Sequence, residues 1–227
     1  MKNDREGNSV SSARRSSYLD AAERVFIRMG YEGASMRIIA AEAGAGIGTL
    51  TYHWNSKESF LQEVFERRLG PVRDKQFEGL RGCQLRLQQG EAVELKEIIS
   101  AWVCPSVNPE WADKNGAEAI RQLYGAVLTE PSEGMVKVIT ELFHGVTFLL
   151  HALTQEVLSN YEPDVFHWLY SCALGVTFYP TSFRHRVSPL FGDFSKNNDW
   201  KKINDIIVGF IVRGMLIEKG EHRLILP

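Results

Sequence analysis

Apolar side chains recur along this 227-residue chain at the spacing of amphipathic helices, not at the alternating spacing of strands. From Ser17 to Met29 the apolar residues follow an i, i+1, i+4, i+5, i+8 pattern. Gly30 can then adopt a left-handed C-terminal cap, which predicts that the first helix ends there. No strand alternation persists long enough to predict a sheet, so the pattern indicates an all-α fold.

Two short helices are expected next, on either side of a turn that contains glycine. Ser35 can cap the amino end of the first short helix. Gly44 can take positive φ in the turn at little cost, and the second short helix follows from about Ile47 to Trp54. The segment Asn55-Ser-Lys-Glu58 is a capping signature, which predicts the start of a fourth helix.

Five further helices are predicted in the remainder of the chain, with prolines between them or near their ends. They cover residues near 91–103, 115–129, 133–159, 163–180 and 202–217.

The motif that indicates a function lies between Met36 and Trp54. Two short helices joined by a glycine-containing turn form the helix-turn-helix layout. The second helix can enter the major groove by its amino end, where small side chains allow close approach to base edges. Donors at its far end and at the start of the next helix can bind phosphates. The predicted DNA-binding residues are Arg37, Ile47, Gly48, Thr49, Thr51, Tyr52, His53 and Lys57.

The region from about residue 18 to 66 resembles the DNA-binding domain of TetR-family transcriptional regulators. Two positions depart from the family pattern, because the family usually has Tyr where this chain has Thr51 and Phe where it has Trp54. Tyr52 could replace the missing phenol one position along. The matching segments are Ala21–Phe26, Gly30–Ala34, Ile39-Ala40, Ala43-Gly44, Gly48–Leu50, Tyr52–Trp54 and Ser56–Glu58.

The resemblance implies an all-helical homodimer whose C-terminal domain binds a small effector and pairs with its twin. It also implies repression that the effector relieves. The expected domains are a flexible arm at residues 1–16, a helix-turn-helix DNA-binding domain at 17–66, and an effector-binding and dimerisation domain at 67–227. The expected partners are a double-stranded DNA operator, a partly apolar effector and a second copy of the chain.

Two segments near the end of the chain, residues 166–178 and 203–217, are apolar on nearly every side. Helices of this kind must be buried on every side, which suits a four-helix dimer seam. An intramolecular core is the alternative explanation. The predicted interface residues are Leu169, Val176, Ile207, Phe210 and Ile211.

Aromatic and histidine side chains in the C-terminal domain could line an effector pocket, although aromatic residues at helical spacing are also typical of a core. His144 and His151 share one helix face, but no Asp, Glu or Cys joins them at metal-ligand spacing. We therefore favour histidines within or beside the core over a metal site. The candidate ligand-binding residues are Trp102, Tyr124, Phe143, His144, Phe148, His151 and Trp168.

Composition is that of a packed globular protein, with 44% hydrophobic and 24% charged residues. The three cysteines, Cys83, Cys104 and Cys172, are far apart and suit thiols in a reducing cytoplasm. The apolar windows fall short of the roughly 20 residues that a spanning helix needs, and the amino terminus lacks a signal-peptide pattern. We therefore expect a cytoplasmic protein with no membrane partner.

The net charge of −2 predicts no general attraction to nucleic acid. Residues 1–57 hold eight Lys or Arg and six Asp or Glu, a net charge of +2, whereas the rest of the chain carries −4. Arg14 and Arg15 precede the first helix and could contact DNA or belong to a weakly contributing arm. No catalytic motif is present, so we predict neither enzyme activity nor a cofactor or metal. A protein-interaction module or a helical enzyme is the alternative.

Overall fold

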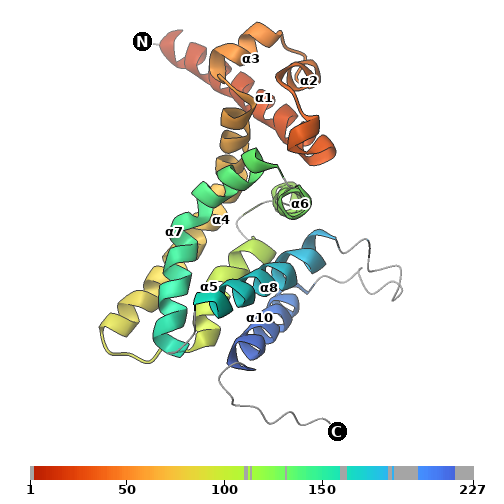
Figure 1. Ribbon diagram of the computed structural model, residues 1–227. Helices are drawn as coiled ribbons and strands as arrows, with labels where there is room; N and C mark the ends of the chain where they lie inside the picture. The colour runs from red at the N-terminus through yellow and green to blue at the C-terminus, as the bar shows by residue number, and fades with distance from the viewer. Residues whose placement is uncertain are drawn as a thin grey trace. The chain divides into compact units, whose positions relative to one another are not determined.

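The computed structural model describes residues 3–109, 112, 114–130, 132–158, 163–183, 186 and 199–217. Every regular element within these ranges is a helix, which confirms the all-α prediction (Figure 1). The helices are α1 (Asn3–Gly33), α2 (Met36–Glu42), α3 (Ile47–His53), α4 (Lys57–Gln88), α5 (Leu95–Val107), α6 (Lys114–Thr129), α7 (Glu133–Leu158), α8 (Pro163–Ser182) and α10 (Trp200–Ile217).

Helix α1 differs from the sequence prediction at its start and agrees with it near its end. It begins at Asn3, so the segment from there to residue 16, expected as a flexible arm, is helical. Near its other end the helical backbone breaks at Gly30, whose φ is 69° and ψ 176°. Glycine adopts this left-handed φ without the steric cost that a Cβ would bring. The break therefore lies where the sequence predicted the end of the first helix.

Three helices continue past prolines at which the sequence suggested an end or a kink. Helix α4 includes Pro71 and extends over 32 residues, while α5 includes Pro105 and α8 includes Pro180. Proline costs a helix one backbone hydrogen bond and a steric clash. Leu69 and Val72, on either side of Pro71, are fully buried, and this packing offsets the local cost.

The chain divides into two compact units, of which unit 1 comprises residues 1–70 and 126–142, and unit 2 comprises residues 71–125 and 143–227. Unit 1 therefore contains the helix-turn-helix region together with the end of α6 and the start of α7. The sequence did not predict that residues 126–142 group with the DNA-binding helices. Its core is apolar and includes Ala22, Val25 and Phe26 of α1 with Phe60, Leu61 and Val64 of α4.

The core of unit 2 gathers buried apolar side chains from the second half of α4 and from α5, α7, α8 and α10. By length and composition alone α7 could cross a membrane. Within the folded chain Val146, Leu150 and Leu153 of α7 are buried in this core. The other core members include Leu80, Ile98, Ile99, Trp102, Val103, Ile207, Val208 and Ile211.

Candidate nucleic-acid interface

Local capping and one tight turn fix the positions of α2 and α3. The Ser35 hydroxyl oxygen accepts a hydrogen bond from the Ile38 backbone N–H at 3.3 Å, which caps α2 as predicted. Gly44, with φ of 62°, makes the turn between the two helices. Ile39 of α2 and Leu50 of α3 are fully buried. One side of this helix pair is thus anchored in unit 1, and its other side is left at the surface.

The exposed side of α3 carries the small side chains that the sequence singled out for base contact. Gly48, Thr49 and Thr51 are exposed, and a Cβ added at Gly48 would meet no other atom within 4 Å. The Thr51 hydroxyl donates to the backbone carbonyls of Ile47 at 3.1 Å and Gly48 at 3.2 Å. The Thr51 methyl group and hydroxyl lone pairs therefore remain for an approaching base.

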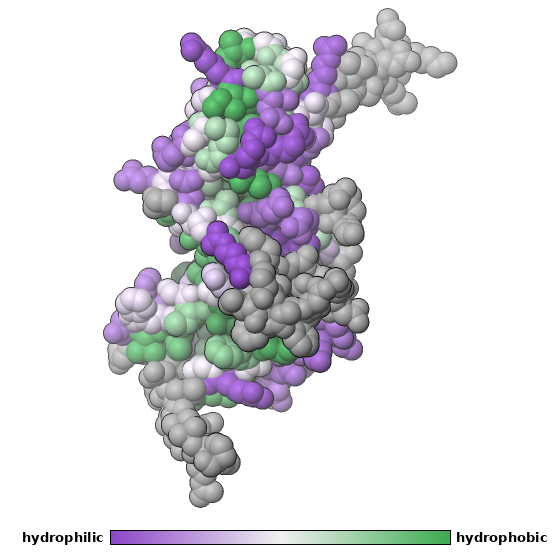
Figure 2. Space-filling view, turned by 90° about the vertical axis from the view of Figure 1, so that its right-hand side faces the viewer, coloured by the Kyte–Doolittle hydropathy of each residue, from purple (hydrophilic) through white to green (hydrophobic). Residues whose placement is uncertain are grey.

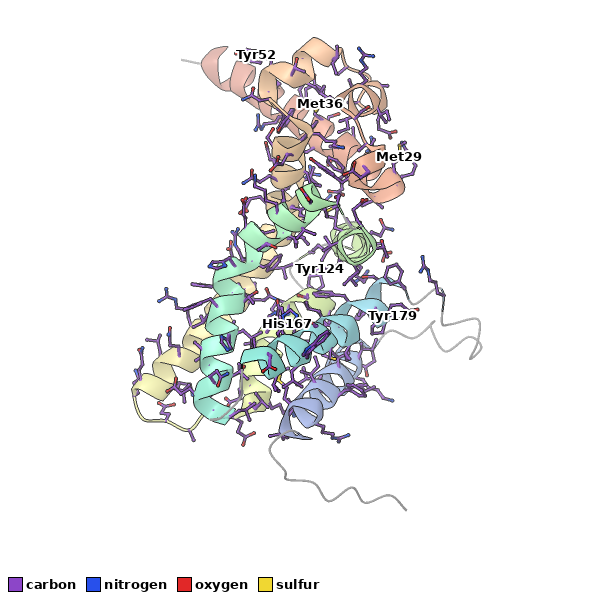
Figure 3. The ribbon with its side chains drawn as sticks, viewed as in Figure 1. Met29, Met36, Tyr52, Tyr124, His167 and Tyr179 are labelled. Carbon is purple, nitrogen blue, oxygen red and sulfur yellow. The ribbon has the colours of Figure 1, made fainter. Side chains whose placement is uncertain are left out.

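Larger side chains border this row on the same surface. Tyr52 lies at the end of α3 (Figure 3) and is 84% exposed. Ile47, at the start of α3, is 41% exposed. Arg37 of α2 is exposed as well, whereas His53 is half-buried against the ring of Tyr18. The structure thus brings seven of the eight predicted DNA-binding residues onto α2 and α3, and those other than His53 are at the surface.

Lys57, the eighth predicted DNA-binding residue, has an internal partner that the sequence did not predict. Its ammonium donates to the backbone carbonyl of Tyr31 at 2.7 Å and lies 4.0 Å from the centre of the Tyr31 ring. Tyr31 directly follows the break in the helical backbone at Gly30. A lysine ammonium has three donors, so the Tyr31 contact leaves two for a phosphate.

Tyr31 is also the point where residues 126–142 attach to the DNA-binding helices within unit 1. The carboxylate of Glu130 accepts the Tyr31 backbone N–H at 3.0 Å. A Cβ added at Gly134 would lie 2.6 Å from the Tyr31 ring, so this approach requires glycine. Lys137 of α7 pairs with Glu58 of α4 at 2.7 Å. These contacts involve residues far apart in sequence, which is why periodicity did not reveal them.

Ion pairs also join α1 to α2 on the surface of unit 1. Glu42 of α2 accepts hydrogen bonds from Arg24 at 2.9 Å and from Arg28 at 3.0 Å. The two guanidinium groups, Arg24 first, hold the pKa of the Glu42 carboxyl below its ordinary value. These arginines are therefore engaged within the protein and leave α3, not α1, as the candidate reading element.

The candidate effector residues in unit 2 do not gather around one site. Trp102 and Tyr124 are buried, and Phe143 and His151 are half-buried. His144 is exposed, and Phe148 and Trp168 are 69% and 67% exposed. Helical spacing gave no information on which face of each helix meets the core. The three exposed residues therefore do not share an enclosed cavity with Trp102 and Tyr124, and a ligand-binding role for each of the seven stays a prediction.

A buried polar cluster joins the two buried candidates, and the sequence did not reveal it. The Gln76 amide nitrogen donates to the Trp102 carbonyl at 2.6 Å and to the Ser106 hydroxyl at 3.1 Å. The Ser106 and Tyr124 hydroxyl oxygens are 3.5 Å apart, and the Tyr124 ring stacks on Phe178 with centroids 4.0 Å apart. Burial raises the pKa of the Tyr124 hydroxyl above its ordinary value, so this group is neutral.

The Gln76 amide oxygen has no hydrogen-bond partner among the residues described, although the side chain is only 1% exposed. Its orientation is determined, because the Trp102 carbonyl can only accept and must face the amide nitrogen. A buried carbonyl without a donor costs about 1–3 kcal/mol. Unit 2 therefore holds a buried acceptor on the side chain that bonds Trp102 and Ser106.

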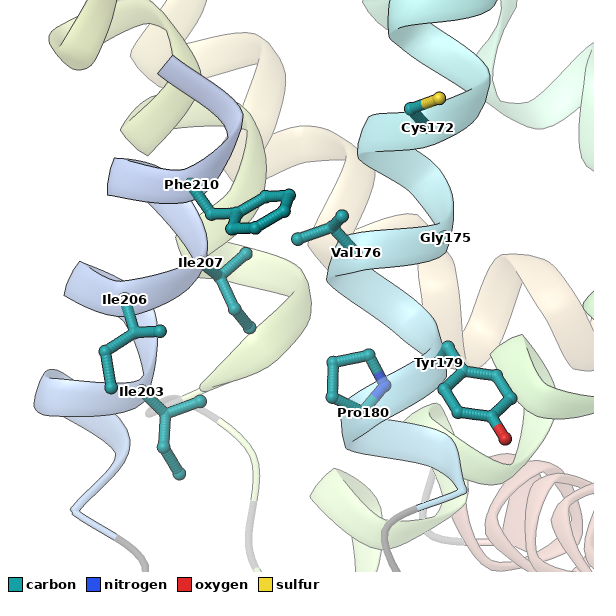
Figure 4. A pocket seen from close by; sticks show the side chains of 9 residues that line it. All are labelled: Cys172, Gly175, Val176, Tyr179, Pro180, Ile203, Ile206, Ile207 and Phe210. Carbon is teal, nitrogen blue, oxygen red and sulfur yellow. The ribbon is translucent and has the colours of Figure 1, made fainter. Parts of the chain in front are cut away.

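An apolar groove of about 850 Å³ runs between α8 and α10 (Figure 4). Val176 of α8 and Phe210 of α10 point toward each other across it, and Phe210 is 65% exposed. The space-filling view also shows hydrophobic surface on the face of the molecule that carries these helices (Figure 2). The lining residues are Cys172, Gly175, Val176, Tyr179, Pro180, Ile203, Ile206, Ile207 and Phe210.

The predicted interface residues fall into two groups relative to this groove. Val176, Ile207 and Phe210 line it, whereas Leu169 and Ile211 do not. Ile207 and Ile211 are only 5% and 4% exposed, because they pack in the core of the same chain. The sequence argument did not find Ile206, which is 61% exposed and lines the groove. A helix that is apolar all round is expected to be covered on every side. The pattern does not show which residues pack in the chain's own core and which are left for a partner.

No group of three His, Cys, Asp or Glu within the described ranges is placed to hold a metal ion. His151 instead packs on the Phe166 ring at 4.2 Å and lies within hydrogen-bond distance of Gln155, at 3.3 Å.

Comparison with known proteins agrees with this architecture. Residues 19–64 match the bacterial regulatory proteins of the tetR family, and residues 100–214 match the tetracyclin repressor-like C-terminal domain. No curated protein matches the chain in sequence.

Similar solved structures share the fold at low sequence identity. A TetR-family transcription regulator from Shewanella sp. PV-4 is 18% identical, with a TM-score of 0.57, covering 88% of this chain and 97% of that one. The fatty acid degradation regulator FadR from Bacillus halodurans is 19% identical, with a TM-score of 0.57 and coverage of 88% and 98%. A SmeT–triclosan complex is 14% identical, with a TM-score of 0.55 and coverage of 89% and 91%.

The two matches cover both the helix-turn-helix region and most of the helical remainder, and the second alone spans half of the chain. The chain therefore belongs to the TetR family of transcriptional regulators, which are DNA-binding proteins and not enzymes.

Proposed function

We propose that this chain is a homodimeric repressor that binds a near-palindromic DNA operator and is released by a small effector. The observation that carries the DNA-binding part is the free face of α3, where Gly48, Thr49 and Thr51 are exposed while Leu50 anchors the helix. A helix presented in this way suits the major groove, which is about 12 Å wide. Tyr52 and Lys57 flank the row as phosphate ligands.

The apolar groove between α8 and α10 supports a second copy as the occupant of that face. A two-fold interface uses the same surface twice, so Phe210 and Ile206 of one protomer would cover the same residues of its partner. Exposed apolar patches with few polar atoms are typical of association sites. A dimer would present two α3 helices, and its operator would contain two half-sites about 34–36 Å apart or slightly more.

The buried cluster in unit 2 supports an effector with a neutral hydrogen-bond donor on an apolar body. A hydroxyl or N–H of the effector would donate to the Gln76 amide oxygen, whose side chain is linked to the Trp102 carbonyl and, through Ser106, to the Tyr124 hydroxyl. Among the described buried residues of unit 2 the charged one is Arg121, which pairs with Glu118 at 2.9 Å. A carboxylate effector would therefore lack a free cation in this cluster.

Helices α6 and α7 provide a covalent path from the effector cluster to the DNA-binding helices. Tyr124 lies on α6 in unit 2, and α6 continues toward Glu130, which holds Tyr31 in unit 1. An effector that favours one position of α6 would thereby favour one position of the DNA-binding helices. The protein would have one conformation that binds DNA and another that does not. The effector causes release of DNA to the extent that it binds the second conformation more tightly than the first.

A gel-shift titration tests the DNA-binding part of this proposal. The probes are a duplex from the region upstream of the chain's own gene and an unrelated duplex of equal length. We expect tighter binding to the first duplex and two protomers in each complex. Equal affinity for both duplexes would contradict the proposal.

Thermal unfolding tests the effector part. A neutral 4-alkylphenol should raise the unfolding midpoint more than the alkylbenzene that lacks its hydroxyl, and Gln76→Met should abolish that difference. Thr154→Val is the matched control, because Thr154 is also buried and lacks a partner within the described chain. A difference that persists in Gln76→Met would contradict this site.

A further inference from the structure

We infer that Trp54, Glu63 and Arg15 form a clamp that positions the recognition helix α3, and that Glu63 and Arg15 act in operator binding through Trp54 and not as DNA contacts. The inference rests on the proposed DNA binding by α3. It concerns one of the two positions at which the chain departs from the usual TetR-family residues, since Trp54 stands where the family usually has Phe.

Trp54 directly follows α3 and holds its carboxyl end. Its backbone N–H donates to the Leu50 carbonyl at 2.8 Å, which closes the last turn of the helix. Its ring stacks on Phe60 with centroids 4.0 Å apart and planes 11° apart, and the side chain is only 3% exposed. A phenylalanine could make the same stacking contact.

The indole N–H adds a contact that phenylalanine cannot make. It donates to a carboxylate oxygen of Glu63 at 2.7 Å. A hydrogen bond to a charged acceptor is short and directional, so it fixes the rotation of the indole as well as its depth in the core. Trp54 is therefore held against α4 by a hydrogen bond as well as by packing.

Arg15 completes the cluster from α1. Its guanidinium donates to both Glu63 oxygens, at 2.9 Å and 2.6 Å, in a bidentate pair. The same guanidinium lies 4.7 Å from the centre of the Trp54 ring, within cation–π range. Each of the three side chains thus contacts the other two. The pair uses Nε and Nη2 of Arg15, so Nη1 keeps its two donors, and salt dependence of binding distinguishes a phosphate contact from the clamp.

Neighbouring contacts extend the clamp along α1. Tyr18, one turn after Arg15, meets the edge of the Trp54 ring at 6.2 Å and lies 6.3 Å from the His53 ring. Arg67 of α4 pairs with Asp20 and Glu23 of α1, each at 2.8 Å. The middle of α1, from Arg15 to Glu23, and the end of α3 are therefore both attached to α4. A recognition element needs support of this kind, because small displacements cost contact with the bases.

The sign of the effect at Glu63 separates a clamp from simple electrostatics. Glu63→Ala removes a negative charge from a DNA-binding unit, and by charge alone it would tighten binding to DNA. The clamp predicts the opposite, a loss of about fivefold in operator affinity, because the indole and Arg15 lose their common partner. Trp54→Phe, which removes the N–H but keeps an aromatic ring, should weaken operator binding in the same direction.

The experiment uses the full chain and two duplexes, one that the wild-type protein selects from a random pool and one unrelated in sequence. Affinity for each is measured by fluorescence anisotropy over a series of KCl concentrations. Arg15→Ala should weaken binding to the selected duplex and leave the salt slope and the affinity for unrelated DNA close to wild type. The effects of Arg15→Ala and Glu63→Ala should not add, since both break the same contact.

Several outcomes would overturn the inference. Operator binding by Glu63→Ala that equals or exceeds wild type would do so. A fall of about one unit in the salt slope of Arg15→Ala, with equal weakening on both duplexes, would make Arg15 a phosphate contact instead. A variant that unfolds is recognised by circular dichroism, and Trp54→Phe then decides the question, because wild-type affinity in that variant also overturns the clamp. If the wild-type protein selects no DNA, the proposed function fails and the clamp fails with it.

Discussion

Replacing Phe210 by Ala should separate the two protomers of the proposed dimer without unfolding either one. The ring is 65% exposed on α10, whereas its neighbours Ile207 and Ile211 are 5% and 4% exposed in the core of the same chain. The substitution therefore removes surface that only a partner would cover. The core that holds α10 against the rest of unit 2 stays intact.

The size of the effect follows from the exposed area. An aromatic side chain buries about 150–250 Å² when covered, so 65% exposure leaves about 130 Å² of Phe210 for a partner. At about 25 cal/mol per Å² this area is worth about 3 kcal/mol per protomer. Both protomers of a two-fold dimer carry the substitution, and the alanine methyl group still buries part of the area. The dimer therefore loses about 5 kcal/mol of association free energy. That corresponds to about 4,000-fold in the dissociation constant.

Sedimentation equilibrium over a dilution series measures this constant directly. We expect a rise of at least about a hundredfold, since a partner need not cover the whole ring. Phe148→Ala is the matched control, because Phe148 is 69% exposed on α7 and does not line the groove. A wild-type dissociation constant for Phe210→Ala, or an equal rise for Phe148→Ala, would refute the assignment of this groove to the seam.

Three further predictions concern base contact, phosphate contact and pH. Replacing Ile47 or Thr51 by Ala should change base preference at particular half-site positions by about 1–3 kcal/mol, and a binding-site selection that returns the wild-type motif would argue against it. Lys57→Ala should weaken binding to all duplexes alike and lower the salt slope by about one unit. An unchanged slope would mean that the Lys57 ammonium contacts Tyr31 but no phosphate. Burial raises the pKa of Tyr124 above its ordinary value of 10.0, so the folded state disfavours the tyrosinate. The contribution of Tyr124 to the free energy of unfolding should be constant below about pH 10 and should fall as the pH rises above that value. The unfolding midpoint of Tyr124→Phe should therefore fall less steeply than that of the wild type over the same range, and an equal fall in both proteins would count against the prediction.

Hydrophobic periodicity predicted α6 and α10 closely, whereas the helix expected over 91–103 spans Leu95–Val107. Helix α6 was expected over 115–129 and spans Lys114–Thr129, and α10 was expected over 202–217 and spans Trp200–Ile217. Sequence reasoning failed where the helix-breaking tendency of proline is outweighed by the packing of neighbouring side chains. Proline ordinarily kinks or ends a helix, but α4 continues through Pro71 as one helix, with fully buried Leu69 and Val72 on either side.

The candidate DNA-binding face could be predicted because it depends on short-range order. Caps, a glycine turn and two short helices determine which side of α3 is free, and all of these lie within residues 35–54. The partners of Lys57 and Glu63 could not be predicted in this way. Tyr31 is 26 residues from Lys57, and Arg15 is 48 residues from Glu63, so only the folded arrangement of α1 and α4 brings them together.

The C-terminal helices show a second limit of sequence reasoning. Phe210 and Ile211 are adjacent and both apolar, yet one is exposed and the other lies in the core. The apolar pattern indicated that both sides of α10 would be covered, and only the structure distinguishes the side that faces its own chain. The same limit explains why the buried Tyr124 and the exposed Phe148 were placed in one predicted pocket.

Selection of binding sites from a random pool of duplexes by the full-length protein tests the central claim most directly. If two α3 helices of a two-fold dimer read DNA, the selected sequences should converge on an inverted repeat. Its half-sites should be centred about one helical turn apart, roughly 34–36 Å, or slightly more. Convergence on a single unrepeated motif, or no convergence at all, would contradict the account.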